Sequence, residues 1–153
     1  MTKRMVIAVL ALGGAFVSAY LTLYKLGYIG QLSCSIGSCE TVQMSKWAKF
    51  LGLPVAAWGV AYYLAVLATA IGGTLPRFTE SRRLSIMLLA EAILGFVFTA
   101  YLTSLEAFVI HAYCIYCLSS AAIVTLILIA SIVDYRELRP LDTTASLRGV
   151  VQP

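Results

Sequence analysis

Four cysteines form two closely spaced pairs, and paired thiols are the residues that carry disulfide chemistry. Cys34 and Cys39 enclose Ser-Ile-Gly-Ser, whereas Cys114 and Cys117 enclose Ile-Tyr. An even number of cysteines in such pairs favours disulfides in an oxidising compartment. Because thiol–disulfide exchange needs direct contact between sulfurs, two pairs can pass electrons only if the fold brings them together.

The second pair is followed by a long apolar run, which predicts that Cys114 begins a helix. Its sulfur would then lie near unpaired N–H groups and the positive end of the helix dipole, which lowers a thiol pKa. Cys117 would lie one turn deeper, where it could meet an electron acceptor dissolved in lipid. Gly37 and its serine neighbours instead predict a mobile, hydrated loop around the first pair.

Two other uses of four cysteines remain open. They could form two purely structural disulfides, or a four-thiolate zinc site with tolerable ligand spacing. An oxidising compartment works against free thiolates, so we predict no metal site.

Three ionisable residues could take part in proton chemistry. Glu106 and His111 lie close to Cys114 in the sequence, and each could move protons or be a solvated turn residue. Glu91 lies within an apolar segment, where carboxylates are candidates for function. A snorkelling role or a polar contact between helices is the alternative for Glu91.

The composition indicates how these residues are positioned. The 153 residues are 61% hydrophobic and 12% charged, whereas soluble domains average about 45–50% apolar and about 25% charged residues. This indicates a protein of the lipid bilayer. The net charge of +4 is expected to set its orientation there, and we predict no nucleic-acid partner.

Four apolar segments are long enough to cross a bilayer as helices. The sequence therefore predicts an all-α, integral membrane four-helix bundle. Residues 1–135 would form one transmembrane redox domain, and residues 136–153 a polar cytoplasmic tail that we expect to be disordered. The first segment, at 20 residues, exceeds the roughly 7–15 of a signal-peptide core and is expected to be retained. The four segments are Met5–Tyr24, Pro54–Ile71, Leu84–Leu105 and Cys114–Val133.

The basic residues predict the orientation of the bundle, because Lys and Arg gather in cytoplasmic loops. Eight of eleven fall at the termini and near residues 72–83, and three fall on the other side. We expect a multi-pass protein of the cell inner (plasma) membrane, with both termini cytoplasmic and the active site on the extracytoplasmic face. The eight are Lys3, Arg4, Arg77, Arg82, Arg83, Arg136, Arg139 and Arg148; the three are Lys25, Lys46 and Lys49.

The first outer loop contains a second pattern. Met44, Trp47, Ala48 and Leu51 recur at helical spacing. This predicts a short amphipathic half-helix that lies over the mouth of the bundle or at the membrane interface.

In this order and spacing, the motifs resemble those of the vitamin K epoxide reductase family, specifically its bacterial members, over about residues 5–135. The motifs are Cys34, Cys39, Ser45-Lys46-Trp47, Ala57-Trp58-Gly59, Tyr101-Leu102 and Cys114-Ile115-Tyr116-Cys117.

The resemblance implies a quinone-reducing thiol oxidoreductase. Cys114 and Cys117 would be the active-site pair, with Cys117 nearest the quinone. Cys34 and Cys39 would be a shuttle pair, in which Cys39 exchanges with Cys114 and Cys34 meets a partner protein.

The resemblance also implies a quinone pocket, in which Ser45 matches a serine of the half-helix that caps it. Trp58 and Tyr62 lie on one face near the outer end of the second helix and could stack on a quinone ring. Aromatic residues there could instead mark the membrane interface. We predict quinone binding by Ser45, Trp47, Trp58, Tyr62 and Cys117.

Two departures from the family pattern bear on the substrate and the partner. Val55 and Ala121 stand where animal members hydrogen-bond vitamin K, so we expect a bacterial quinone (ubiquinone or menaquinone) as substrate. Many bacterial members carry a fused thioredoxin-like domain, and this chain ends without one. A separate extracytoplasmic thioredoxin-like partner is therefore expected.

The predicted function is re-oxidation of that partner at the expense of a membrane quinone, in support of disulfide bond formation. An unrelated four-helix disulfide-oxidase family of bacteria is less similar, because its C-x-x-C lies in the first loop. The alternative of another class is a structural or transport membrane protein with inert disulfides.

Overall fold

Four long helices dominate the computed structural model, which describes the backbone of residues 2–30, 38–75, 77 and 81–151 and side chains within these ranges as far as residue 137. Each contains a stretch long and apolar enough to cross a membrane. The predicted all-α membrane bundle is therefore confirmed. The helices are α1 (Thr2–Lys25), α3 (Val55–Gly72), α4 (Arg82–Leu105) and α5 (Ile115–Val151).

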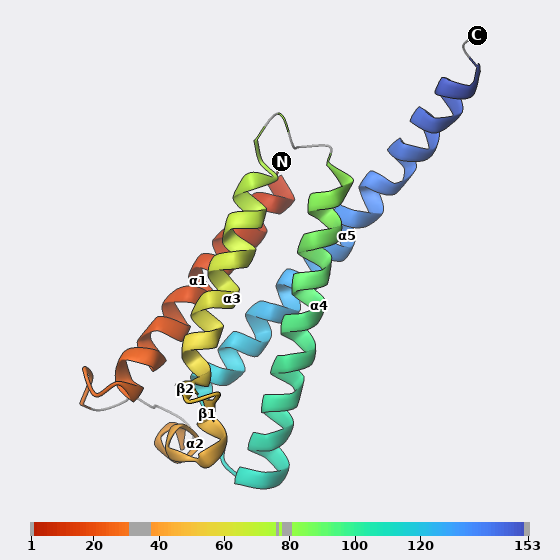
Figure 1. Ribbon diagram of the computed structural model, residues 1–153. Helices are drawn as coiled ribbons and strands as arrows, with labels where there is room; N and C mark the ends of the chain where they lie inside the picture. The colour runs from red at the N-terminus through yellow and green to blue at the C-terminus, as the bar shows by residue number, and fades with distance from the viewer. Residues whose placement is uncertain (1, 31–37, 76, 78–80, 152–153) are drawn as a thin grey trace.

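The helices pack so that the two ends of the bundle differ. α1 packs against α3 and α5, while α4 packs against α5 and α3. Both termini lie at one end, and the short elements of the first loop lie at the other (Figure 1). We call the second end the sulfur end, because it also contains the start of α5 with its two cysteines.

The bundle has the surface and the packing of a membrane protein. Large apolar side chains point outward, as in Phe16 and Leu94, which are 70% and 69% exposed. Inside, small residues let helices approach closely. A Cβ atom on Gly14 would come within 2.2 Å of the Tyr63 ring, and one on Gly95 within 2.3 Å of the Tyr62 ring.

The segment between α1 and α3 contains the expected short helix, but the helix lies earlier than the apolar pattern predicted. It ends at Met44, because Ser45 adopts an extended conformation. The chain then forms a hairpin whose turn residues, Leu51 and Gly52, both have positive φ, as a two-residue hairpin turn requires. The short helix of the first loop is confirmed, but the prediction that it runs continuously from Met44 to Leu51 is wrong. The elements are α2 (Cys39–Met44), η1 (Lys46–Ala48), β1 (Lys49–Phe50) and β2 (Leu53–Pro54).

The last helix extends beyond the expected membrane domain. Its backbone is helical as far as Val151, past the domain boundary placed at residue 135. The division into a membrane domain and a polar tail stays a prediction.

A buried ion pair joins the helices at the termini end. Arg4 is 2% exposed, and its Nε lies 3.2 Å from an Asp134 carboxylate oxygen. The guanidinium also donates to Ser85 Oγ at 2.9 Å and to the Gly73 carbonyl at 2.7 Å. These bonds connect α1 with α4, α5 and the end of α3.

We predict that Arg4→Met destabilises the bundle by about 3–5 kcal/mol, because removing one partner leaves a buried charge without its counterion. Thermal unfolding in detergent measures this loss. Lys3→Met is the matched control, because Lys3 pairs with Glu137 where both side chains are largely exposed, at 39% and 65%, and such pairs contribute about 0–1 kcal/mol. Equal unfolding temperatures for the two variants would contradict this account.

Candidate active site

The second cysteine pair lies at the start of α5, as predicted. Cys114 occupies the cap position just before the helix, and its carbonyl accepts a hydrogen bond from Leu118 N–H at 3.0 Å. Cys114 is completely buried, whereas Cys117, one turn further, is partly exposed. Both are free thiols.

The Cys114 sulfur is held in an environment that favours its thiolate. A hydrogen bond from the Cys117 thiol is the main cause that lowers the pKa of Cys114 to about 7, against the opposing effect of burial. The backbone N–H groups of Tyr116 and Cys117 lower it further, while the Glu106 charge opposes them. These N–H groups belong to the first turn of α5, where backbone donors are available to a capping acceptor such as this sulfur. Near neutral pH, Cys114 is therefore a nucleophile.

Cys39 of the first pair lies close to the second pair at this end. Cys39 begins α2 and is 1% exposed. The Ser38 N–H donates a hydrogen bond to the Tyr113 carbonyl at 3.0 Å, so the residues that precede Cys39 and Cys114 are joined by their backbones. Cys39 and Cys114 belong to one buried apolar cluster. Cys39 and the second cysteine pair thus share one end of the bundle.

The oxidation state of Cys39 bears on the zinc alternative. Cys39 is disulfide-bonded, and a sulfur held in a disulfide cannot act as a thiolate ligand. Cys34 and the mobile loop predicted around Gly37 lie outside the described residues. The roles expected for Cys34 therefore stay predictions.

A buried carboxylate contacts both free cysteines. Glu106 is 3% exposed, and its Oε2 accepts a hydrogen bond from the Cys114 backbone N–H at 3.2 Å. The Glu106 carboxylate also lies within hydrogen-bonding reach of Cys117, so the single thiol proton of Cys117 is shared between Glu106 and the Cys114 sulfur. The alternative that Glu106 is a solvated turn residue is therefore wrong. Sequence reasoning could not decide this, because the contacts depend on the path of the chain between α4 and α5.

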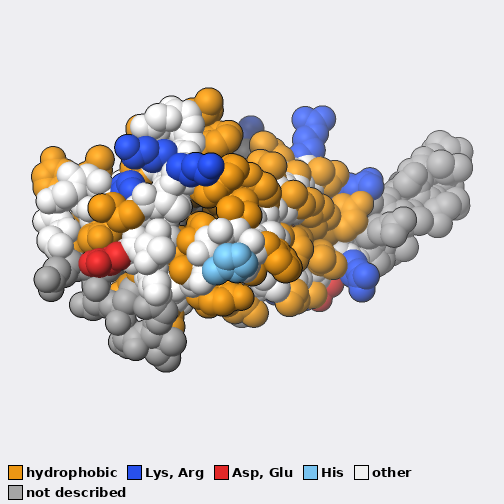
Figure 2. All heavy atoms as spheres, turned by 90° about the horizontal axis from the view of Figure 1, so that it is seen from below, with side chains coloured by type: hydrophobic (Ala, Val, Ile, Leu, Met, Phe, Trp, Pro, Cys, Tyr) orange, Lys and Arg blue, Asp and Glu red, His pale blue; other side chains and the backbone are white. Residues whose placement is uncertain are grey.

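That path is unusual in two respects. α4 continues into η2 (Glu106–Ile110), a π-helical turn that is closed by a bond from the His111 N–H to the Glu106 carbonyl, which also accepts from the Ala112 N–H at 3.2 Å. His111 then adopts a left-handed conformation with φ 54°. Both features are rare and often occur at functional sites. Here they turn Glu106 inward, while His111, the only histidine in the chain, is exposed on the sulfur end (Figure 2).

A cavity of about 320 Å³ lies beside Cys117. This volume falls within the range of about 300–1,000 Å³ that is typical of small-molecule sites. Most of its wall is apolar or aromatic, and α1, α3, α4, α5 and the first-loop elements all contribute. The five residues predicted to bind a quinone all line it: Ser45, Trp47, Trp58, Tyr62 and Cys117.

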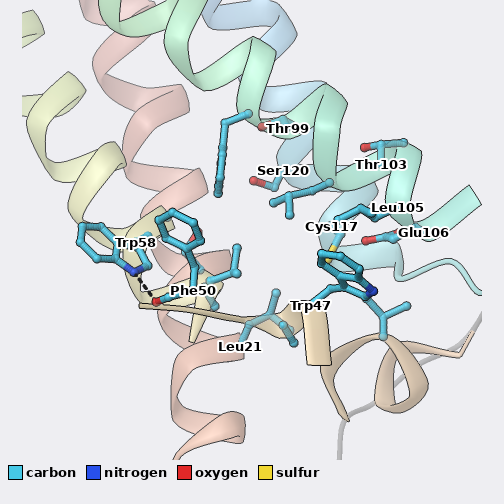
Figure 3. Close-up of a pocket in the computed structure, with 18 of the residues that line it drawn as sticks. Leu21, Trp47, Phe50, Trp58, Thr99, Thr103, Leu105, Glu106, Cys117 and Ser120 are labelled. Carbon is cyan, nitrogen blue, oxygen red and sulfur yellow. Dashed lines mark hydrogen bonds between the residues drawn. The ribbon is translucent and has the colours of Figure 1, made fainter. Parts of the chain in front are cut away.

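Aromatic rings form the wall opposite Cys117 (Figure 3). The Phe50 ring meets Trp58 edge-on with centroids 6.3 Å apart, and Phe98 at 6.5 Å. The Trp58 indole N–H also donates to the Phe50 carbonyl at 3.2 Å, which fixes the hairpin against α3. Phe50 and Phe98 were missed from the sequence. Phe98 could have been found from the sequence, because its spacing from Leu94 and Leu102 places it on the same face of α4. The position of Phe50 in the wall depends on the hairpin, which the sequence did not predict.

Two polar groups of the wall have capacity for a ligand. Among the described residues, the buried Tyr62 hydroxyl has no hydrogen-bond partner. Ser45 Oγ donates to the Val42 carbonyl at 2.7 Å, and its oxygen can still accept a bond. A flat apolar molecule with carbonyl oxygens suits this combination of rings and isolated polar groups.

Glu91 lies away from this cavity. Its Oε1 accepts a hydrogen bond from Thr69 Oγ1 at 3.1 Å, which joins α4 to α3. This contact favours the expected polar link between helices.

The sequence also matches a known family. The model of the vitamin K epoxide reductase family matches residues 5–132, a span that contains all four cysteines and the apolar part of all four helices. The site and the match agree on the chemistry, since a buried thiolate, a second thiol and a neighbouring disulfide are the groups that thiol–disulfide exchange requires. The chain belongs to the vitamin K epoxide reductase family and is a multi-pass membrane thiol–disulfide oxidoreductase.

Proposed function

We propose that this protein transfers electrons from a thioredoxin-like partner to a membrane quinone and thereby supports disulfide bond formation. One observation carries the proposal: Cys117 lines an apolar cavity, while its partner Cys114 shares a buried cluster with Cys39. This arrangement offers a sulfur route from the loop to the cavity. The family match supports the same kind of chemistry.

Each step of the relay moves two electrons. The dithiol of the partner reduces the Cys34–Cys39 disulfide and becomes a disulfide itself. Cys39 then attacks Cys114 in the oxidised inner pair, which regenerates the Cys34–Cys39 disulfide and leaves Cys114 and Cys117 reduced. The reduced inner pair passes two electrons to the quinone, which leaves as the quinol. The state with Cys39 in a disulfide and Cys114 and Cys117 as free thiols corresponds to the point just before quinone reduction.

The charge distribution supports an orientation with the sulfur end outside. Eight of the eleven basic residues lie at the termini, in the α3–α4 connection or in the first turn of α4, and both termini lie at one end of the bundle (Figure 1). The positive-inside rule would place that end in the cytoplasm. The cysteines would then face the extracytoplasmic side of the inner (plasma) membrane, where a thioredoxin-like partner could reach them.

The cavity wall supports a simple quinone as the acceptor. Val55 lines the cavity, and its apolar side chain stands where animal members were expected to hydrogen-bond vitamin K. The rings of Trp47, Trp58 and Phe50 offer stacking or edge contacts, which contribute about 0.5–1.5 kcal/mol each. We therefore propose ubiquinone or menaquinone as the substrate, bound by Ser45, Trp47, Trp58, Tyr62 and Cys117.

The proposal is tested by quinone reduction in detergent, with a reduced thioredoxin-like protein as electron donor and a short-chain ubiquinone or menaquinone as acceptor. Wild-type protein should produce one quinol for each donor disulfide formed. Replacing any one cysteine by Ser should abolish turnover, because each sulfur carries one step of the relay.

Ser119→Ala is the matched control, since Ser119 is exposed on α5 two residues from Cys117 and donates only to the Ile115 carbonyl. It should keep the wild-type rate. If the wild-type protein forms no quinol and its disulfides stay inert, the proposal is wrong. That result would favour the structural or transport alternative.

We also predict that quinone reduction accelerates as the pH rises through about 7, the pKa of Cys114. Below this pH the Cys114 thiol is protonated, so its sulfur cannot close the disulfide with Cys117 as two electrons pass to the quinone. Ultraviolet absorbance of the thiolate, recorded with pH in a Cys34→Ser/Cys39→Ser background, measures the ionisation directly.

Cys117→Ala should shift this titration upward, because it removes the thiol that hydrogen-bonds to the Cys114 sulfur. Cys117→Ser provides the comparison, since its hydroxyl can still donate. An unchanged titration in Cys117→Ala would contradict the assigned cause.

A further inference from the structure

Glu106 stands out among the groups that the electron relay does not use. Its buried carboxylate touches the Cys114 N–H and the Cys117 thiol, and the same residue lines the cavity. We propose that Glu106 is the proton-transfer residue of quinone reduction, taking the proton from Cys117 and giving it to the quinone oxygen. This inference rests on the proposed function.

The contacts of Glu106 suit a group that moves one proton over a short path. The Cys114 N–H binds Oε2 at 3.2 Å and so fixes the orientation of the carboxylate. The hydrogen bond to Cys117 places the carboxylate against the sulfur that faces the cavity. In Figure 3, Glu106 and Cys117 lie on the same side of the pocket, across from Trp58. A bound quinone beside Cys117 would therefore lie within reach of Glu106.

The Tyr62 and Tyr63 hydroxyls also line the cavity, but of these three groups it is Glu106 that contacts Cys117. Among the described residues that line the cavity, it is the only one with a carboxyl, amino or imidazole group. On α2, which packs against η2, Glu40 is exposed and Cys39 is in a disulfide. His111, at the end of η2, is exposed on the surface.

The first half of the reaction then balances as follows. The Glu106 carboxylate accepts the Cys117 thiol proton, and the Cys117 thiolate adds to a quinone ring carbon, forming a C–S bond. The displaced electron pair moves to the quinone oxygen, which takes the proton from Glu106. The carboxylate is regenerated and no net charge is created in the cavity.

The second half returns the enzyme to its oxidised form. The Cys114 thiolate attacks the Cys117 sulfur, so that an S–S bond forms and the C–S bond breaks. The electron pair of the C–S bond stays with the ring, whose second oxygen takes a proton from water. The inner pair loses two electrons, and the quinone gains two electrons and two protons.

The test is a single turnover of pre-reduced protein with a short-chain quinone, followed by quinol absorbance. Glu106→Gln keeps an oxygen that can accept from the Cys114 N–H but cannot carry a proton. It should slow quinone reduction by about 100-fold or more, the usual contribution of general acid–base catalysis. Glu106→Asp should retain part of the rate. Glu91→Gln, which changes another carboxyl group of the same membrane span outside the cavity, should keep the wild-type rate.

Chemical rescue separates proton transfer from a structural role. In Glu106→Ala, added acetate should restore part of the single-turnover rate in proportion to its concentration, whereas chloride at equal ionic strength should not. Thermal unfolding of Glu106→Gln should stay within a few degrees of wild type, which shows that the slow rate is not due to misfolding.

A wild-type rate in Glu106→Gln, an equal loss in Glu91→Gln, or no rescue by acetate would overturn the assignment. These outcomes differ from failure of the proposed function, in which the wild-type protein itself forms no quinol.

Discussion

The hydrogen bond from the Cys117 thiol to the Cys114 sulfur is the interaction on which the site depends. It makes the buried sulfur a nucleophile near neutral pH and leaves the partly exposed sulfur protonated beside the cavity. The bond exists because the two cysteines are one turn apart at the first turn of α5, where backbone N–H groups also donate to the Cys114 sulfur. A helix that began a few residues later would separate the sulfurs and lose both effects. The start of α5 is therefore the most constrained point of the fold.

The rest of the bundle keeps that point in place while leaving space beside it. At the termini end, Arg4 and Asp134 join the helices through a buried ion pair, and glycines such as Gly14 let helices pack closely. At the sulfur end, short elements of the first loop cover a cavity between the helices. The hairpin, anchored by the bond from Trp58 to the Phe50 carbonyl, closes one wall of the cavity, and the π-turn with Glu106 closes another. The bundle therefore has a buried ion pair at the termini end and a covered cavity at the sulfur end.

Much of this architecture was accessible from the sequence, because lipid imposes strong constraints. Apolar length alone predicted the four helices, and the position of C-x-x-C before an apolar run predicted a cysteine pair at a helix start. The residues proposed for the quinone pocket all line one cavity. Trp58 and Tyr62 could be predicted together, because they are four residues apart on one face of a helix near the predicted outer end. The half-helix was misplaced because eight residues of helical spacing cannot reveal a break at Ser45 or a positive-φ turn at Leu51. The burial of Glu106 was inaccessible, since it depends on a π-turn and on a contact with Cys114.

The central claim, that electrons pass between the two cysteine pairs by direct exchange, is tested most directly by trapping the intermediate. In Cys117→Ser, the Cys114 thiolate can attack Cys39 in the proposed Cys34–Cys39 disulfide and release the Cys34 thiol, and no Cys117 sulfur is present to break the new Cys39–Cys114 bond. Non-reducing digestion and mass spectrometry of protein from alkylated membranes should yield a peptide pair that joins Cys39 to Cys114, absent when Cys39 is also replaced by Ser. If Cys114 is instead recovered as a free thiol in a folded Cys117→Ser protein, the two pairs do not exchange and the relay does not exist.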